Sequence, residues 1–292
     1  MYYYKLCGLN LESVIKIPIF EKNNSVFSPD LTISFSEESS SSILETFRWG
    51  NKTTIFKNDS IFFRRRSGLV FEINNDSKIY IYLNDSIDKE TIWESIIGVP
   101  MGFALRQKGF TVMHGSAVSF KSNTVCIIGT SGLGKSTIAL SLFNMGYNFI
   151  TEDLCIIKNK KIYPYSPWIK STPEVIDNLK IKYSDHLNLK FDLRKRSLFK
   201  LENFSSNISH APKIAFFPIE GSESRIVKMN NDKIFKFLFT NFYRTDFTLE
   251  EDLNSITKIS ELFNCYSFER DINKPINENI NFLSEHIESI LN

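Results

Sequence analysis

The spacing of hydrophobic and polar residues divides the chain into a strand-rich first part and a mixed second part. Up to about residue 85, apolar and polar residues alternate, or β-branched and aromatic residues gather in short runs between polar turns. The polar run "SEESSSS" over 36–42 is expected to be a surface loop. The short runs themselves predict strands at 31–35, 52–63, 69–73 and 78–84.

Helical spacing begins after these strands. Residues 86–109 are predicted to be helical, with Pro100 starting the last piece and Gly109 capping its end. Two strands, a loop and a helix closed by Gly146 follow, at 110–120, 124–129 and 135–146. Further elements are expected as a hairpin of 147–157 with 161–166, a strand at 213–219, and helices near 233–243, 259–264 and 278–292.

This order of elements predicts an α/β protein with two domains, a small β-rich domain over 1–105 and a larger α/β domain over 106–292. The length of 292 residues, 42% of them hydrophobic, is sufficient for two cores. A net charge of +2 gives no reason to expect a nucleic-acid partner. The four cysteines are far apart, and no run is long enough for a signal peptide or a membrane span. We therefore expect a reduced cytoplasmic protein without a membrane partner.

One glycine-rich segment carries a specific chemical signal. It matches G-x-x-x-x-G-K-[ST] between a β-rich run and a helical run. Glycines let backbone N–H groups surround an anion, and the following helix adds the positive end of its dipole. Lys135 is expected to reach the β- and γ-phosphates, and Ser136 to bind Mg²⁺. The predicted nucleotide-binding residues are Gly129, Thr130, Ser131, Gly132, Leu133, Gly134, Lys135, Ser136 and Thr137.

An acidic pair and a histidine extend this signal. Glu152 and Asp153 follow Ser136 within the expected strand 147–157, where charged side chains are costly unless a metal or substrate uses them. One carboxylate can hold Mg²⁺ beside Ser136, and the other can take a proton from an attacking hydroxyl. The alternative is a solvated strand end. His114 precedes the loop on the neighbouring expected strand, as a structural residue or as part of the same site.

The combination "MHGSAV … GTSGLGKSTIAL … GYNFITED" resembles the C-terminal kinase domain of HPr kinase/phosphorylase and its HPr-kinase-like relatives. The resemblance implies a P-loop kinase domain with a mixed sheet and flanking helices, and ATP and Mg²⁺ as cofactors. It implies Lys135, Glu152, Asp153 and His114 as catalytic residues, with Ser136 and the acidic pair as metal ligands. The family usually has Asp-Asp, so the glutamate at position 152 leaves open which carboxylate is the base and whether phosphorolysis occurs.

The substrate is less constrained by the sequence. The layout of the chain is similar to divergent HPr-kinase-like proteins of peptide-natural-product gene clusters, some of them similar to lasso-peptide precursor kinases. This implies a peptide or small protein with an acceptor serine, while the resemblance to HPr kinase/phosphorylase implies a homo-oligomer. A kinase of a small hydroxyl metabolite and an ATP-hydrolysing binding module remain alternatives. The clusters Arg64–Arg66 and Arg194–Arg196 are either anion-binding residues or solvated turns.

Overall fold

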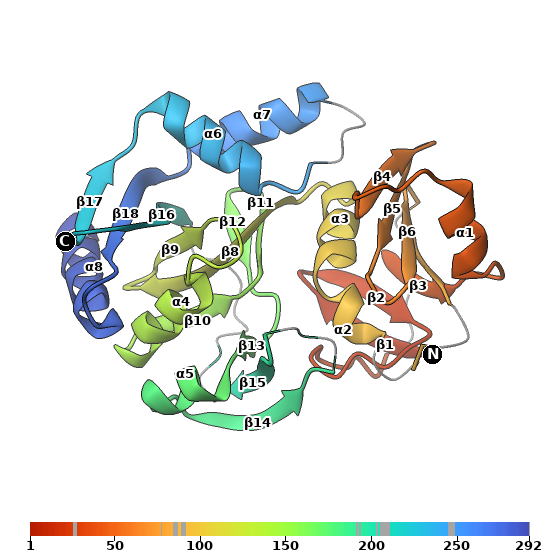
Figure 1. Ribbon diagram of the computed structural model, residues 1–292, viewed down its shortest axis with the longest axis horizontal. Coiled ribbons are helices and arrows are strands. Elements are labelled where there is room, and N and C mark those ends of the chain that lie inside the picture. Colours follow the sequence, from red (N-terminus) through yellow and green to blue (C-terminus); the bar gives the residue numbers. More distant parts are fainter. Residues whose placement is uncertain are drawn as a thin grey trace. The chain divides into compact units, whose positions relative to one another are not determined.

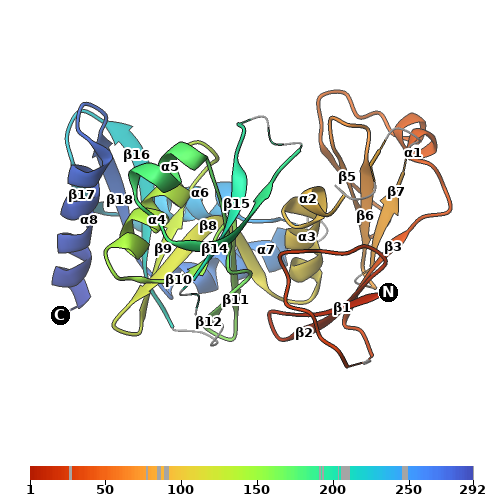
Figure 2. The ribbon, with the colours of Figure 1, turned by 90° about the horizontal axis from the view of Figure 1, so that it is seen from below.

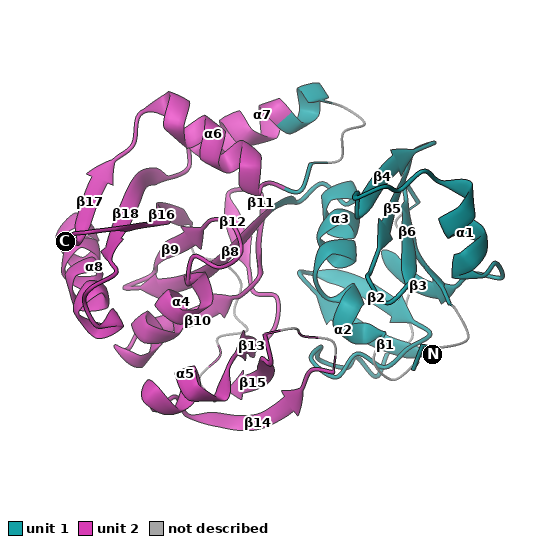
Figure 3. Ribbon diagram, viewed as in Figure 1, with its two compact units in different colours: residues 1–112, 243–252 teal, residues 113–242, 253–292 magenta. Residues whose placement is uncertain are grey.

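Two compact units make up the chain (Figures 1 and 3). Unit 1 comprises Met1–Val112 and Tyr243–Asp252, and unit 2 comprises Met113–Phe242 and Leu253–Asn292. No helix among the described residues is long and apolar enough to cross a membrane. The computed structural model describes residues 1–25, 28–76, 78–83, 87–88, 92–190, 192, 194–202, 204, 211–244 and 249–291.

Unit 1 is built on a seven-stranded sheet in the order β1-β2-β3-β7-β6-β5-β4. The pairs β2/β3 and β3/β7 are parallel and the others are antiparallel. The predicted strands at 31–35, 69–73 and 78–84 are confirmed, with residue 84 outside the described part of the chain. The expected strand 52–63 is divided into β4 and β5, and β1 and β2 are added by the structure. The strands are β1 Tyr2–Leu6, β2 Leu9–Ser13, β3 Leu31–Phe35, β4 Thr54–Lys57, β5 Ser60–Arg64, β6 Val70–Asn74 and β7 Lys78–Tyr82.

The helices of unit 1 correct one expectation and refine another. Helix α1, Ser40–Thr46, begins inside the serine run that was expected to be a loop, because Ser39 caps it by accepting a hydrogen bond from the Ser42 N–H. The expected helical stretch 86–109 contains α2, Trp93–Ile96, and α3, Val99–Gln107. Its residues 86 and 89–91 lie outside the described part of the chain.

A buried ion pair joins the returning segment Tyr243–Asp252 to the rest of unit 1. Arg106, on α3, donates from Nη2 to Asp252 Oδ1 at 2.6 Å, and their side chains are 9% and 1% exposed. Arg106 also donates to the backbone oxygens of Tyr243 and Phe110 at 3.1 and 2.9 Å. Several donors of one guanidinium thereby tie together segments that are far apart in sequence.

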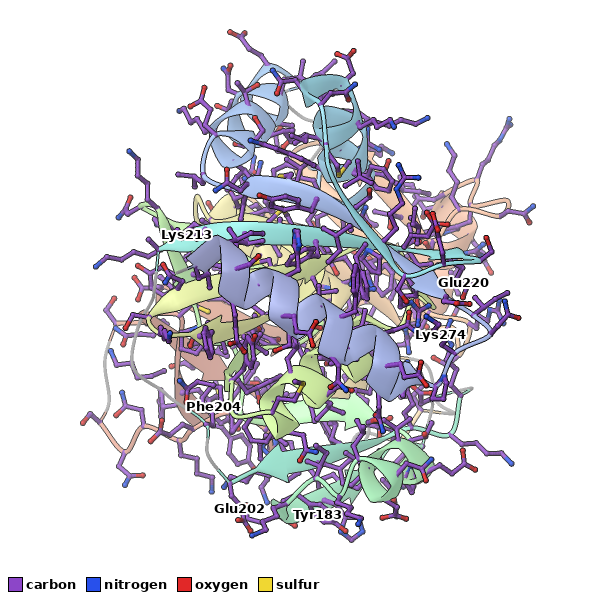
Figure 4. All side chains as sticks on the ribbon, turned by 90° about the vertical axis from the view of Figure 1, so that its left-hand side faces the viewer. Tyr183, Glu202, Phe204, Lys213, Glu220 and Lys274 are labelled. Atoms are coloured by element: carbon purple, nitrogen blue, oxygen red, sulfur yellow. The ribbon has the colours of Figure 1, made fainter. Side chains whose placement is uncertain are left out.

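Unit 2 is centred on a mixed sheet in the order β12-β11-β8-β9-β16-β18-β17, with β10 also paired to β8. Strands β9, β16 and β18 are parallel neighbours, so their carboxyl ends share one edge. Figure 4 marks the two ends of β16 by Lys213 and Glu220. The strands are β8 Thr111–Phe120, β9 Asn123–Ile128, β10 Asn148–Thr151, β11 Leu154–Lys158, β12 Lys161–Tyr163, β16 Pro212–Gly221, β17 Arg225–Lys228 and β18 Asn264–Asp271.

Helices cover both faces of this sheet (Figures 1 and 2). Alternating residues of β9 divide between two cores: Val125 and Ile127 join one, and Cys126 and Ile128 join the other. The first core includes α4 and α8, and the second includes α6 and α7. These helices are α4 Lys135–Asn144, α6 Asn231–Asn241, α7 Leu249–Ser260 and α8 Ile276–Leu291.

A small sheet in the order β13-β15-β14 and the short helix α5 complete unit 2. Their bounds are β13 Trp168–Ser171, α5 Pro173–Asn178, β14 Tyr183–Asn188 and β15 Ser197–Leu201. The structure confirms the mixed α/β class. Two expectations are wrong: 147–157 is divided into β10 and β11, and the helix near 259–264 is the end of α7 followed by β18.

Candidate functional site

The glycine-rich loop connects β9 to α4, as the sequence predicts. Gly132 and Gly134 have φ values of 101° and 75°, which L side chains rarely adopt. Lys135 begins α4 and donates from Nζ to the Thr130 carbonyl oxygen at 2.9 Å, across the loop. Burial lowers the pKa of Lys135. The lysine is thus held over the loop by a weak backbone acceptor that an incoming anion can replace.

The acidic pair lies at a break between strands, not inside one. Glu152 and Asp153 fall between β10 and β11, and Asp153 has a φ of 68°. Strand β10 is antiparallel to β8, and β8 is antiparallel to β9, so β10 ends at the edge where the glycine-rich loop begins. The turn therefore presents both carboxylates beside the loop and removes the conflict of charges within a strand.

Glu152 is held by the first turn of α4. The Ser136 hydroxyl donates to its Oε1 at 2.7 Å, and the glutamate is only 9% exposed. Burial and the neighbouring Asp153 raise the pKa of Glu152. Hydroxyl and carboxylate oxygens are the hard ligands that Mg²⁺ prefers, so Ser136 and Glu152 fit this ion. No cluster of three or more His, Cys, Asp or Glu residues suited to a metal occurs among the described residues.

Asp153 has two positively polarised neighbours. Lys170 Nζ lies 3.3 Å from Oδ2, and His114 Nδ1 lies 3.2 Å from Oδ1 and 3.1 Å from the Asp153 carbonyl oxygen. Because both oxygens are acceptors, Nδ1 carries the imidazole proton. Burial alone would raise the pKa of Asp153, but Lys170 and His114 outweigh it and hold this pKa well below its usual range. Asp153 in turn raises the pKa of Lys170.

These groups line one pocket of about 270 Å³ in unit 2. Of the predicted residues, the pocket brings together His114, the acidic pair and most of the loop, whereas Gly129, Thr130 and Leu133 lie outside its lining. Sequence reasoning missed four of its lining residues, Lys170, Ser171, Thr172 and Val175. A lysine in the apolar run "YSPWIKS" followed by the capping pair Thr-Pro was the available signal.

The arginine clusters have different structural roles. Arg194 and Arg196 line the pocket, and Arg196 is held by Asp192 at 2.6 Å, while Lys195 is exposed. Arg64 instead donates to the backbone oxygens of Lys52 and Gly50, within unit 1. The second cluster therefore contributes cations to the lining of the candidate site.

Comparison with known proteins finds local sequence similarity to HPr kinase/phosphorylases. No protein-family model matches the chain. The HPr kinase/phosphorylase of Chlorobaculum tepidum is 30% identical over 86 residues, which span 30% of this chain and 20% of that protein. The corresponding enzyme of Chlorobium phaeovibrioides is 30% identical over 91 residues, spanning 31% of this chain and 26% of that protein.

Among solved structures, the Hpr(Ser) kinase/phosphatase of Coxiella burnetii aligns with a TM-score of 0.30 at 10% identity, covering 62% of this chain and 99% of that one. This alignment is too weak to add to the sequence matches. Those matches cover about a third of the chain and are to the same family that the sequence resembles. Over the matched residues the chain is similar to HPr kinase/phosphorylases.

Proposed function

We propose that the protein is an ATP-dependent kinase that transfers the γ-phosphoryl group to a serine hydroxyl of a peptide or small protein. The observation that carries the proposal is the convergence of two carboxylates, each with different partners, on one pocket beside the glycine-rich loop. The sequence matches to HPr kinase/phosphorylases support the reaction class. The peptide acceptor follows from the wider sequence resemblance alone.

The two carboxylates divide the work between them. Glu152, bonded to Ser136, belongs to the Mg²⁺ side of the site, where the ion would neutralise phosphate charge. Asp153, with His114 and Lys170, belongs to the acceptor side. The acceptor oxygen bonds to the γ-phosphorus, the bond to the leaving β-phosphate oxygen breaks, and Asp153 takes the hydroxyl proton.

The remaining cations stabilise the charge that moves during transfer. Lys135 leaves the Thr130 carbonyl oxygen for the β- and γ-phosphates. The Arg194 side chain approaches the loop, with Nη2 3.9 Å from the position of a Cβ added to Gly132. Cations placed in advance around the transferred group lower the barrier because they need not reorganise during the reaction.

The test follows the label from γ-labelled ATP. The full chain is incubated with Mg²⁺ and serine peptides, or with a panel of small hydroxyl compounds. We expect label on a peptide serine, and a loss of about 10²–10⁴-fold in kcat for Asp153→Asn. The matched control is Asp177→Asn, at an exposed carboxylate of α5. Label only in free phosphate would contradict the kinase proposal and indicate an ATP-hydrolysing module. Label in a small compound would contradict the peptide acceptor and indicate a kinase of a small hydroxyl metabolite.

A further inference from the structure

A second pocket, of about 420 Å³, lies beside the glycine-rich loop next to helix α6. It lies within unit 2, and its lining residues differ from those of the first pocket. Its apolar lining comes from the loop, from β16, from the turn before α6 and from α6 itself, through Leu133, Ile219, Met229 and Phe237. A pocket of this size and lining takes an apolar side chain well.

One face of α6 adds positive charge to this lining. Lys233, Lys236, Phe237 and Thr240 follow the spacing of a single helix face, and all four line the pocket. Both lysines are exposed. Within the described part of the chain, neither has a carboxylate within ion-pair distance. The pocket therefore combines an apolar interior with an uncompensated positive margin, which is complementary to an acidic, apolar segment.

Residues of the glycine-rich loop form part of this pocket and connect it to the first one. Lys135, which is expected to reach the β- and γ-phosphates, is bonded to Thr130, and Thr130 lines the second pocket. The Gly129 N–H donates to the His114 carbonyl oxygen at 3.3 Å, so the pocket adjoins the residue that holds Asp153. The pocket thus adjoins the loop that is expected to hold the β- and γ-phosphates.

From these observations we infer that the second pocket binds the acceptor chain itself. An apolar side chain near the acceptor serine fills the interior, and Lys233 and Lys236 pair with an acidic group beside it. The inference rests on the proposed kinase function, because that function defines an acceptor end. It names the substrate class as peptides with apolar and acidic residues close to the serine.

The test uses the full chain and three fluorescein-labelled peptides. The first is Glu-Leu-Gly-Ser-Gly-Leu-Glu, whose flanks are alike in both directions, so the result does not depend on the orientation of the bound chain. The second replaces Glu by Gln and Leu by Gly, and the third replaces Glu by Lys. Fluorescence anisotropy gives the Kd, and label transfer from γ-labelled ATP gives kcat/KM.

We expect the native protein to bind the first peptide roughly tenfold or more tightly than either of the others. In the double variant Lys233→Glu/Lys236→Glu, the preference between the Glu and Lys peptides should reverse, because opposite charges again face one another. Both lysines are exposed, so the variant should fold. Lys258→Glu, an exposed lysine on α7, is the matched control and should retain the native preference.

The remaining outcomes separate this inference from the proposed function. Equal binding of the three peptides by the native protein, or an unreversed preference in the double variant, overturns the inference. A double variant that loses affinity for ATP but not for inorganic triphosphate, with its peptide preference intact, assigns the pocket to the nucleoside and also overturns it. If the native protein prefers the first peptide and the double variant reverses that preference, but no label appears on the peptide, only the kinase function is contradicted.

Discussion

At the scale of single residues, two adjacent carboxylates have opposite pKa shifts. Burial and the charge of Asp153 raise the pKa of Glu152, which has one hydroxyl donor. Asp153 is also penalised by burial, but Lys170 and His114 overcome that penalty and lower its pKa. Two neighbouring carboxylates whose surroundings shift their pKa values in opposite directions are typical of active sites in which each carboxylate has a different role.

Replacing Lys170 by Met should shift the pH dependence of transfer. The folded-state pKa of Asp153 is depressed, so the ionised form that accepts the proton persists to low pH in the native protein. Without the lysine charge this pKa rises, and the acidic limb of the kcat/KM profile should move to higher pH. Lys200→Met, on the neighbouring strand β15, should leave the profile in place. An unmoved acidic limb in Lys170→Met would contradict the role of Asp153 as the base.

Replacing Glu152 by Gln should stabilise the ligand-free protein while it abolishes transfer. The folded-state pKa of Glu152 is raised. Its favourable contribution to the free energy of unfolding is therefore present below the unfolded-state pKa and is lost as pH rises through the folded-state pKa. Above that window the buried carboxylate is ionised at a cost that the amide avoids. We expect a Tm a few degrees higher at pH 8 and little difference at pH 4, measured by calorimetry. A lower Tm at pH 8 would show that the Ser136 hydrogen bond outweighs the burial of charge.

At the scale of elements, the strands and helices that the sequence predicts are those with capping or periodicity signals within a few residues. The strands around the glycine-rich loop, the helix after it and the caps at Gly109 and Gly146 all have signals within a few residues. Helix α1 was missed because serines favour loops as strongly as helix caps. The cations Lys170, Arg194 and Arg196 come from β13 and the segment before β15, and only tertiary pairing brings them to the acidic pair. The core of the site was therefore predictable, Arg194 and Arg196 were candidates with an open role, and Lys170 was missed.

Breaking the ion pair between α3 and the returning segment Tyr243–Asp252 should cause a large loss of stability. Replacing Arg106 by Met breaks its ion pair with Asp252, which is 1% exposed, and breaking a buried pair costs about 3–5 kcal/mol. Urea unfolding followed by circular dichroism measures this change in the free energy of unfolding. Adding Asp252→Leu should recover much of the loss, because the pair is then replaced by apolar side chains of similar size. A double variant no more stable than Arg106→Met would assign the loss to the backbone contacts of Arg106.

At the scale of the whole molecule, the chain crosses between its two units three times. The compact units divide after Val112, and the segment Tyr243–Asp252 returns to unit 1 before Leu253 resumes unit 2. A boundary near residue 105 follows from the change in periodicity, but no local signal marks a segment that returns after 130 residues of the other unit. The described lining residues of both pockets belong to unit 2, so nucleotide binding should act on that unit first.

Hydrogen exchange should therefore separate the two units. A ligand that binds only the folded protein stabilises the part that must unfold to release it, by about 2.7 kcal/mol at a hundredfold excess over Kd. Because each unit has core clusters of its own, we expect ATP with Mg²⁺ to slow exchange in β9 and β16 and to leave β5 and β6 unchanged, as measured by mass spectrometry of peptides. Lys135→Ala should remove the effect. Equal slowing in β5 and β6 would show instead that the three crossings make the two units unfold as one cooperative body.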